Sequence, residues 1–229
     1  MPPVSSRREA KPETHLQWAE RLLQMLPLEA TSYQHRPIIV TWKGYDGATA
    51  YESRADCSGF LNALLMRAYP LTEKDLEAWL GTKRPLAKTY HDAIVDENQF
   101  QSIRAIQDVQ PGAVIAIEYP PDDPESGPDT GHVLLVADRP RRRDPSAPIM
   151  SGTTQWEVSI IDQSRTGHGV KDTRHLPDGG YASGLGKGVM RIYASRSGNV
   201  RGHSWSTSAS SKFRAQAERH LVIGRLPIG

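Results

Sequence analysis

Cys57 is the residue with the clearest potential for chemistry, because it is the only cysteine among the 229 residues and its neighbours are polar. Asp56 precedes it, and the following residues repeat with the period of a helix, whose apolar face would contain Phe60, Leu61, Leu64, Leu65 and Ala68. We expect Asp56 to cap this helix and Cys57 to lie in its first turn, where backbone N–H groups and the helix dipole favour a thiolate. A lone cysteine is more often a small buried hydrophobe, but the polar flanks here favour a nucleophile.

Two further polar residues lie at the edges of predicted strands. His132 is at the beginning of the strand predicted for residues 131–138, and Asp162 is at the end of the strand predicted for 156–162. If these strands are antiparallel neighbours, the two side chains come close together. Acyl transfer at a thiolate needs an imidazole that accepts and returns a proton, and a polar group that orients this imidazole. We therefore predict that Cys57 is the nucleophile, His132 the general base and then acid, and Asp162 the orienting residue. Gln163 and His168 remain alternatives for the third role.

The elements that must position these residues are helices in the first half of the chain and strands in the second. We expect a disordered lead-in at 1–13, then an N-terminal helix and linker at 14–36. The main domain would span 37–229, with a core at about 40–195 and a Ser-rich extension with one last strand at 196–229. Helices are predicted at 57–69, 72–81 and 87–95, and strands at 113–119, 131–138, 156–162, 188–194 and 220–226. Helices followed by antiparallel strands are typical of an α+β fold.

The segment Asp56-Cys57-Ser58-Gly59-Phe60 resembles the Asp-Cys-Ser-Gly-hydrophobic signature of the NlpC-type cell-wall peptidases, a family of papain-like cysteine peptidases. Other parts of residues 40–195 are similar to that family. They are the proline turn at 84–86, the Pro-Gly strand at 109–115, in which Ala113 replaces the usual aspartate, and the histidine strand at 131–136. The resemblance implies a papain-like α+β fold, in which the nucleophile helix packs on an antiparallel sheet of about five to six strands.

The resemblance also implies an activity, namely hydrolysis of a peptide bond in the stem peptides of bacterial peptidoglycan. The family has a tyrosine roughly a dozen residues before the cysteine, near the oxyanion site, and Tyr45 has a suitable spacing although the Trp-Gly-Gly around it is absent. The backbone amides of Cys57 and Ser58 are the safer oxyanion donors, as at any helix N-terminus. Two alternatives remain open: an amidase or acyltransferase acting on another amide or ester, and a non-catalytic binding domain.

Composition excludes several other functions. A net charge of +2 predicts no strong attraction to nucleic acid or to an anionic membrane. A single cysteine allows no intramolecular disulfide and no multi-cysteine metal site, and the histidines show no metal-ligand spacing, so we expect no metal and no cofactor. Neither a signal peptide nor an apolar run of about 20 residues is visible. We therefore expect a protein that is cytoplasmic as made or exported by a leaderless route, with a peptide or peptidoglycan substrate and, for an exported effector, an immunity or regulatory protein as partner.

Overall fold

The computed structural model describes residues 13–123, 127 and 129–227. Its α-helices agree closely with the predicted ones and are α1 (His15–Met25), α2 (Cys57–Ala68), α3 (Glu73–Leu80) and α4 (Ala87–Val95). Single 3-10 turns occur at Leu28–Ala30 and Ile106–Asp108. The predicted lead-in, residues 1–13, falls outside the described residues except for Glu13. None of the helices described is long and apolar enough to cross a membrane.

Local capping signals explain where these helices begin. Thr14 and Gln17 form a capping box at the start of α1, and Thr72 forms one with Asp75 at the start of α3. The carboxylate of Asp56 accepts a hydrogen bond of 2.6 Å from the backbone N–H of Gly59, which confirms the predicted cap of α2. Each cap satisfies backbone donors that have no partner within the helix.

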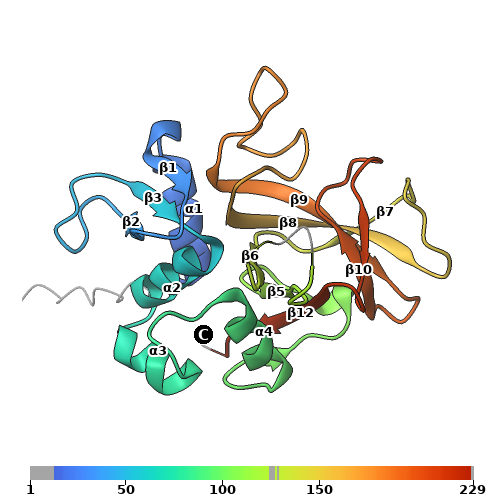
Figure 1. Cartoon of the computed structure of the whole chain (residues 1–229), viewed down its shortest axis with the longest axis horizontal. Helices are drawn as coiled ribbons and strands as arrows, with labels where there is room; N and C mark the ends of the chain where they lie inside the picture. Colours follow the sequence, from blue (N-terminus) through green and yellow to red (C-terminus); the bar gives the residue numbers. More distant parts are fainter. Residues whose placement is uncertain (1–12, 124–126, 128, 228–229) are drawn as a thin grey trace, which may run out of the picture.

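The strands form two sheets (Figure 1). A three-stranded sheet has the order β1-β3-β2, with the bounds β1 (Thr31–Tyr33), β2 (Ile39–Thr41) and β3 (Glu52–Ala55). A nine-stranded sheet has the order β11-β10-β9-β8-β6-β5-β12-β4, and β7 pairs with β8 outside this path. Its strands are β4 (Gln101–Ser102), β5 (Val114–Glu118), β6 (Gly131–Val136), β7 (Arg141–Arg143), β8 (Thr154–Ser164), β9 (Gly184–Ala194), β10 (Val200–Ser204), β11 (Phe213–Ala215) and β12 (His220–Arg225).

The predicted papain-like fold, with a nucleophile helix on a sheet of about five to six strands, is wrong. The main sheet has nine strands, all pairings in it are antiparallel, and a separate three-stranded sheet precedes α2. One reason is that β8 and β9 each have 11 residues, so that β7 and β10 can pair along their extended ends. Another is that residues 196–229 contribute β10, β11 and β12 instead of a single last strand, with β12 pairing between β5 and β4.

Apolar residues line both faces of the main sheet because its central strands are buried on both sides. In β6, Val133 and Leu135 face the core under α1, α2 and α4, whereas Leu134 and Val136 face a second core. The sheet curls around this second core, so that β10 and β12 lie against one another although they are not neighbours in the strand order. Figure 1 shows the helices and the small sheet gathered on one side of this curled sheet. Because side chains alternate along β6, His132 lies on the same face of that strand as Leu134. Helix α2 packs against β6.

Candidate active site

Cys57 is the first residue of α2, and its side chain is buried, with 5% of the residue exposed. The capping residue Asp56 is itself held from outside the helix. Its second carboxylate oxygen accepts hydrogen bonds from the guanidinium of Arg84 at 2.7 Å and from the ring of His35 at 3.2 Å. The Arg84-Pro85 turn therefore anchors the N-terminus of the cysteine helix. These contacts set the position and direction of Cys57.

His132 lies between a carboxylate and the thiol. Its Nε2 donates a hydrogen bond of 2.7 Å to Oδ2 of Asp162, and the Cys57 side chain is close enough for its charge to act on the ring. Burial by itself would lower the pKa of His132. The negative charges of Cys57 and Asp162 outweigh this effect and raise the pKa to about 10. The three residues that were predicted to act together are thus brought together, and they favour a proton on the imidazole next to the sulfur.

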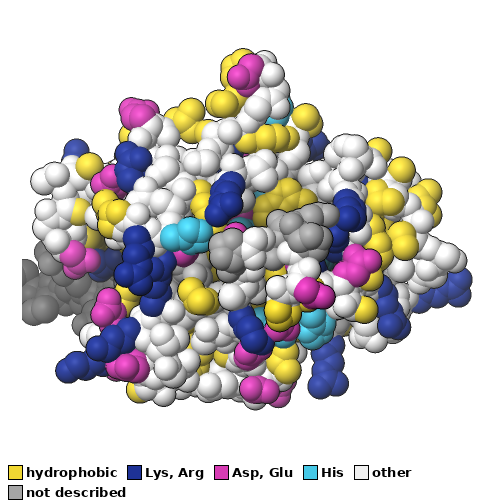
Figure 2. Space-filling model, viewed as in Figure 1, with side chains coloured by type: hydrophobic (Ala, Val, Ile, Leu, Met, Phe, Trp, Pro, Cys, Tyr) yellow, Lys and Arg dark blue, Asp and Glu magenta, His cyan; other side chains and the backbone are white. Residues whose placement is uncertain are grey.

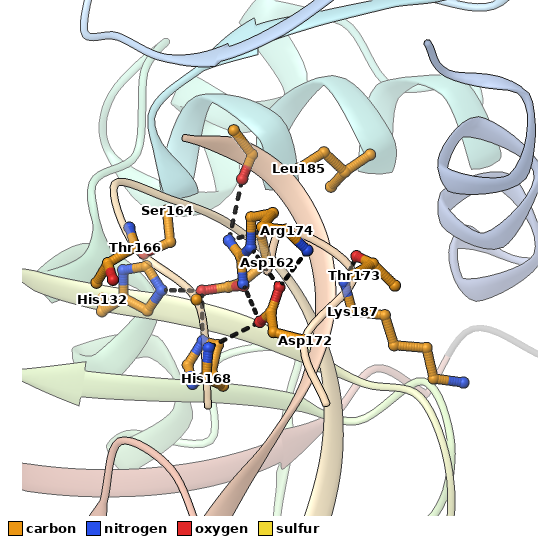
Figure 3. A network of polar contacts seen from close by, with 12 residues as sticks. His132, Asp162, Ser164, Thr166, His168, Asp172, Thr173, Arg174, Leu185 and Lys187 are labelled. Carbon is orange, nitrogen blue, oxygen red and sulfur yellow. Dashed lines mark hydrogen bonds and ion pairs between the residues drawn. The ribbon is translucent and has the colours of Figure 1, made fainter. Parts of the chain in front are cut away.

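Asp162 is the centre of a buried network in which several donors converge on one carboxylate (Figure 3). Oδ2 accepts a second hydrogen bond, of 3.1 Å, from His168, and Oδ1 accepts one of 2.8 Å from Arg174. Arg174 is paired in turn with Asp172 at 2.8 Å. Burial would raise the pKa of Asp162, but Arg174 and the two histidines hold it well below its usual range. The carboxylate therefore stays charged and can hold the ring of His132 in one orientation.

The alternatives for the third role have other contacts. His168 bonds to Asp162 on the same oxygen as His132 and stacks on Trp205, with ring centroids 4.1 Å apart. Gln163 uses its amide to connect β8 to the small sheet, since Nε2 donates to the carbonyl oxygens of Ser32 and Ser53. His168 thus supports Asp162, and Gln163 connects two sheets.

The two auxiliary residues of the predicted site differ in location. Ser58 lines the same cavity as Cys57, and its hydroxyl donates to Asp56 at 3.1 Å, so the side chain takes part in the cap. Tyr45 lies elsewhere. Its ring packs edge-on against Trp18 with centroids 4.8 Å apart, and its hydroxyl accepts a hydrogen bond from Arg21. The tyrosine near Cys57 is Tyr33, from β1 of the small sheet. Burial and then the charge of Cys57 raise the pKa of its phenol.

Two cavities meet at the Cys57–His132 pair. One, of about 510 Å³, is lined by Cys57 and Ser58, and the other, of about 370 Å³, by His132 and Trp205. Tyr33 and Asp129 line both of them. Acidic and basic side chains are interspersed over the face of the molecule in Figure 2. The wall of the cavity at His132 contains Arg165, Lys212, Arg214 and Arg219 among aromatic and polar side chains, and Arg219 is paired with Asp123 at 2.6 Å.

Several residues of the site were not found by sequence reasoning. Arg174 and Asp172 belong to a glycine-rich segment that was predicted only as a loop, and Trp205 belongs to the Ser-rich segment. Trp205 packs edge-on against His132, with ring centroids 5.0 Å apart, and covers His168. The one available signal was the presence of an arginine and an aspartate two residues apart in an otherwise small and polar loop, which is too common a pattern to indicate a buried ion pair.

Comparisons with known proteins give a relative but no activity. No family model matches the chain, and no solved structure matches it. The chain is 36% identical over 222 residues to the uncharacterized protein R653 of Acanthamoeba polyphaga mimivirus, and the match covers 94% of this chain and 97% of the viral protein. Identity at this level over nearly both whole lengths establishes common family membership. The chain therefore belongs to the same family as this mimivirus protein.

Proposed function

We propose that the protein is a cysteine-dependent hydrolase that cleaves an amide bond through an acyl-enzyme on Cys57. One observation supports this proposal above all others. The imidazole of His132 is bonded to the buried carboxylate of Asp162 and also faces Cys57, at the point where two cavities meet. Nucleophile, base and orienting group are the parts that acyl transfer at a thiol needs.

The proposed reaction has two halves. The Cys57 thiolate attacks the carbonyl carbon, and the backbone N–H groups at the start of α2 stabilise the oxyanion that forms. The His132 imidazolium gives its proton to the leaving nitrogen as the C–N bond breaks, which leaves a thioester. In the second half neutral His132 takes a proton from water, the hydroxide attacks the thioester, and the thiolate leaves. Asp162 stays ionised throughout and keeps the Nε2–H of His132 directed toward itself.

The proposed substrate is a peptide bond in peptidoglycan stem peptides. This choice is supported by the local signature at residues 56–60 and not by the fold, whose main sheet differs from the papain-like one. An amide or ester of different origin would use the same chemistry, so substrate profiling has to decide.

Two measurements on purified protein test the proposal. The first is the rate at which iodoacetamide alkylates Cys57 at pH 7, measured by mass spectrometry for wild type, His132→Gln and a matched control, His175→Gln, whose ring contacts Tyr181. We expect fast labelling in wild type and control, and labelling at least about tenfold slower in His132→Gln. A Cys57 with the reactivity of an ordinary thiol would instead indicate a non-catalytic binding domain.

The second measurement is hydrolysis, with purified muropeptides and simple acyl esters as substrates. Cys57→Ala should abolish it, while circular dichroism shows an intact fold. Turnover of the esters but not of the muropeptides would keep the cysteine chemistry and reject the cell-wall substrate. Hydrolysis that survives Cys57→Ala would reject the whole assignment.

A further inference from the structure

A second group of histidines lies beside the proposed active site and has no part in the mechanism. His91 is on α4, Glu118 is the last residue of β5, and His220 is the first residue of β12. His220 and Glu118 are direct partners in the β5–β12 pairing, so that their side chains lie next to each other. One ligand-type atom from each of the three residues lies within 4.8 Å of the others.

The central contact of this group joins two imidazoles. Nε2 of His91 and Nδ1 of His220 are 2.8 Å apart, and the ring centroids are 4.9 Å apart. Such a pair of neutral rings shares one proton between two nitrogens. A divalent cation in place of that proton would bind both nitrogens, which must then move to about 3.3 Å apart, the separation in a tetrahedral zinc site. The required movement is about half an ångström.

The remaining contacts of these side chains fix the positions of the carboxylate and of the His91 ring. Oε2 of Glu118 is 3.8 Å from Nδ1 of His91, while Oε1 bonds to Lys88 at 2.6 Å. The same Nδ1 is 3.1 Å from the carboxylate of Asp92, which leaves Nε2 as the nitrogen that faces His220. A carboxylate that accepts the second N–H of a histidine fixes the tautomer in which the first nitrogen can bind a metal. All ligands stand on a helix or on strands, which makes their positions well defined.

We propose that His91 Nε2, His220 Nδ1 and Glu118 Oε2 form a binding site for Zn²⁺. Two imidazole nitrogens and one carboxylate oxygen are a typical ligand set for zinc, whereas Mg²⁺ and Ca²⁺ prefer oxygen ligands only. This assignment replaces the expectation of a protein without a metal site. Glu118 follows His91 by 27 residues and precedes His220 by 102 residues, so no local motif in the sequence indicates this site.

The site would connect α4 with the β5–β12 edge. Glu118 pairs with Gly131, the residue before His132, and a Cβ at Gly131 would come within 2.0 Å of the Ile117 carbonyl oxygen and 3.3 Å of the Ala87 side chain on α4. The packing between α4 and this end of β6 is therefore tight. Zinc would stabilise the contact beside His132 without touching the reacting atoms.

Lys88 gives the proposal an independent test because its ammonium group competes with a metal ion for Glu118. It bonds to Glu118 at 2.6 Å and to Asp92 at 3.2 Å. Removing this positive charge should strengthen zinc binding. We expect Lys88→Met to bind zinc several times more tightly than the parent chain, and an unchanged affinity would rule out Glu118 as a ligand.

The experiment uses the full chain with Cys57→Ser in every sample, so that zinc cannot bind to the cysteine. The protein is freed of metal with EDTA, dialysed and titrated with ZnCl₂ against a chromophoric chelator, and the zinc retained per chain is measured by mass spectrometry. We expect one zinc per chain and a higher melting temperature with zinc. His220→Gln and Glu118→Gln should weaken binding by at least about tenfold, while His175→Gln, outside the site, should not. Equal binding by His220→Gln and the parent, or no retained zinc, would overturn the proposal. Neither result depends on hydrolytic activity.

Discussion

Two histidine clusters lie on neighbouring strands of the main sheet but have opposite electrostatic surroundings. His132 faces a carboxylate whose side chain is 0% exposed and a thiol, and both partners can be anionic. His91 faces the imidazole of His220, and its two carboxylate neighbours, Asp92 and Glu118, are 48% and 30% exposed. Anionic neighbours raise the pKa of His132 to about 10, whereas burial and the neighbouring His91 lower the pKa of His220. The first cluster therefore holds a proton between charged partners, whereas the second brings two imidazole nitrogens to 2.8 Å from each other.

The largest expected effect on stability comes from neutralising the carboxylate of Asp162, and the same change at Glu118 serves as the comparison. Asp162→Asn should lower the free energy of unfolding by about 3–5 kcal/mol, because the buried Arg174 and two histidines lose the charge that compensates them. Glu118→Gln, in EDTA, should cost at most about 1 kcal/mol, because its ion pair with Lys88 is partly exposed to water. Urea unfolding at pH 7 measures both values.

The same pair of variants can also contradict this comparison. Equal losses for Asp162→Asn and Glu118→Gln would mean that the Asp162 network is not buried as described. A small loss for Asp162→Asn, with unchanged alkylation of Cys57, would remove the orienting role from this carboxylate.

A second effect is a pH dependence of stability that comes from His132. Its pKa is about 10 in the folded protein and about 6.5 in an unfolded chain. The folded protein therefore binds this proton more tightly, and the resulting stabilisation is complete below pH 6.5 and lost as the pH rises toward 10. The slope for one proton is at most about 1.4 kcal/mol per pH unit.

The measurement compares wild type with His132→Gln by urea unfolding between pH 6.5 and 9.5. We expect the stability difference between the two proteins to shrink steadily as the pH rises. Cys57→Ser should show a weaker dependence than wild type, because the charge of Cys57 is the largest cause that raises the pKa of His132. A difference that stays constant from pH 6.5 to 9.5 would show that burial dominates and that the ring is neutral in the folded protein.

The local parts of this molecule could be predicted from the sequence. The cap at Asp56 was predicted and is confirmed. It depends, like the capping boxes of α1 and α3, on residues within one helical turn. The long-range parts could not. Strands β10 (Val200–Ser204) and β11 (Phe213–Ala215) are short, contain arginine and lack the alternation that marks a strand. Their formation depends on long-range pairing, since β10 pairs with the end of β9 and β11 pairs with β10.

The same division runs through the site. Cys57 and His132 could be identified because one lies at a helix start and the other at a strand start, and local sequence patterns mark both positions. The pairing of Arg174 with Asp162 depends on how the segment after β8 folds back on the sheet, which no nearby residue reveals. The two tyrosines show the limit most clearly, because spacing along the chain favoured Tyr45 while the fold places Tyr33 beside Cys57.

The smallest expected effect distinguishes these two tyrosines. Tyr33→Phe removes a hydroxyl from the cavity at Cys57, and the loss of a polar group near a thiolate should slow its alkylation by about two- to fivefold, equivalent to about 0.4–1 kcal/mol. Tyr45→Phe removes only the acceptor of an Arg21 hydrogen bond of 3.0 Å. It should leave alkylation unchanged and lower the free energy of unfolding by about 0.5–1 kcal/mol.

Both variants keep the aromatic ring and therefore the packing, so that the two rates can be compared directly. Alkylation slowed by Tyr45→Phe but not by Tyr33→Phe would reverse the assignment and return the oxyanion role to Tyr45. It would also require the loop at 43–47 to move toward Cys57. That movement would break the contacts of the Tyr45 ring with Trp18 and with Arg67. Equal rates for wild type and both variants would leave the backbone N–H groups of α2 as the groups that stabilise negative charge at the sulfur, since no side-chain hydroxyl would then contribute.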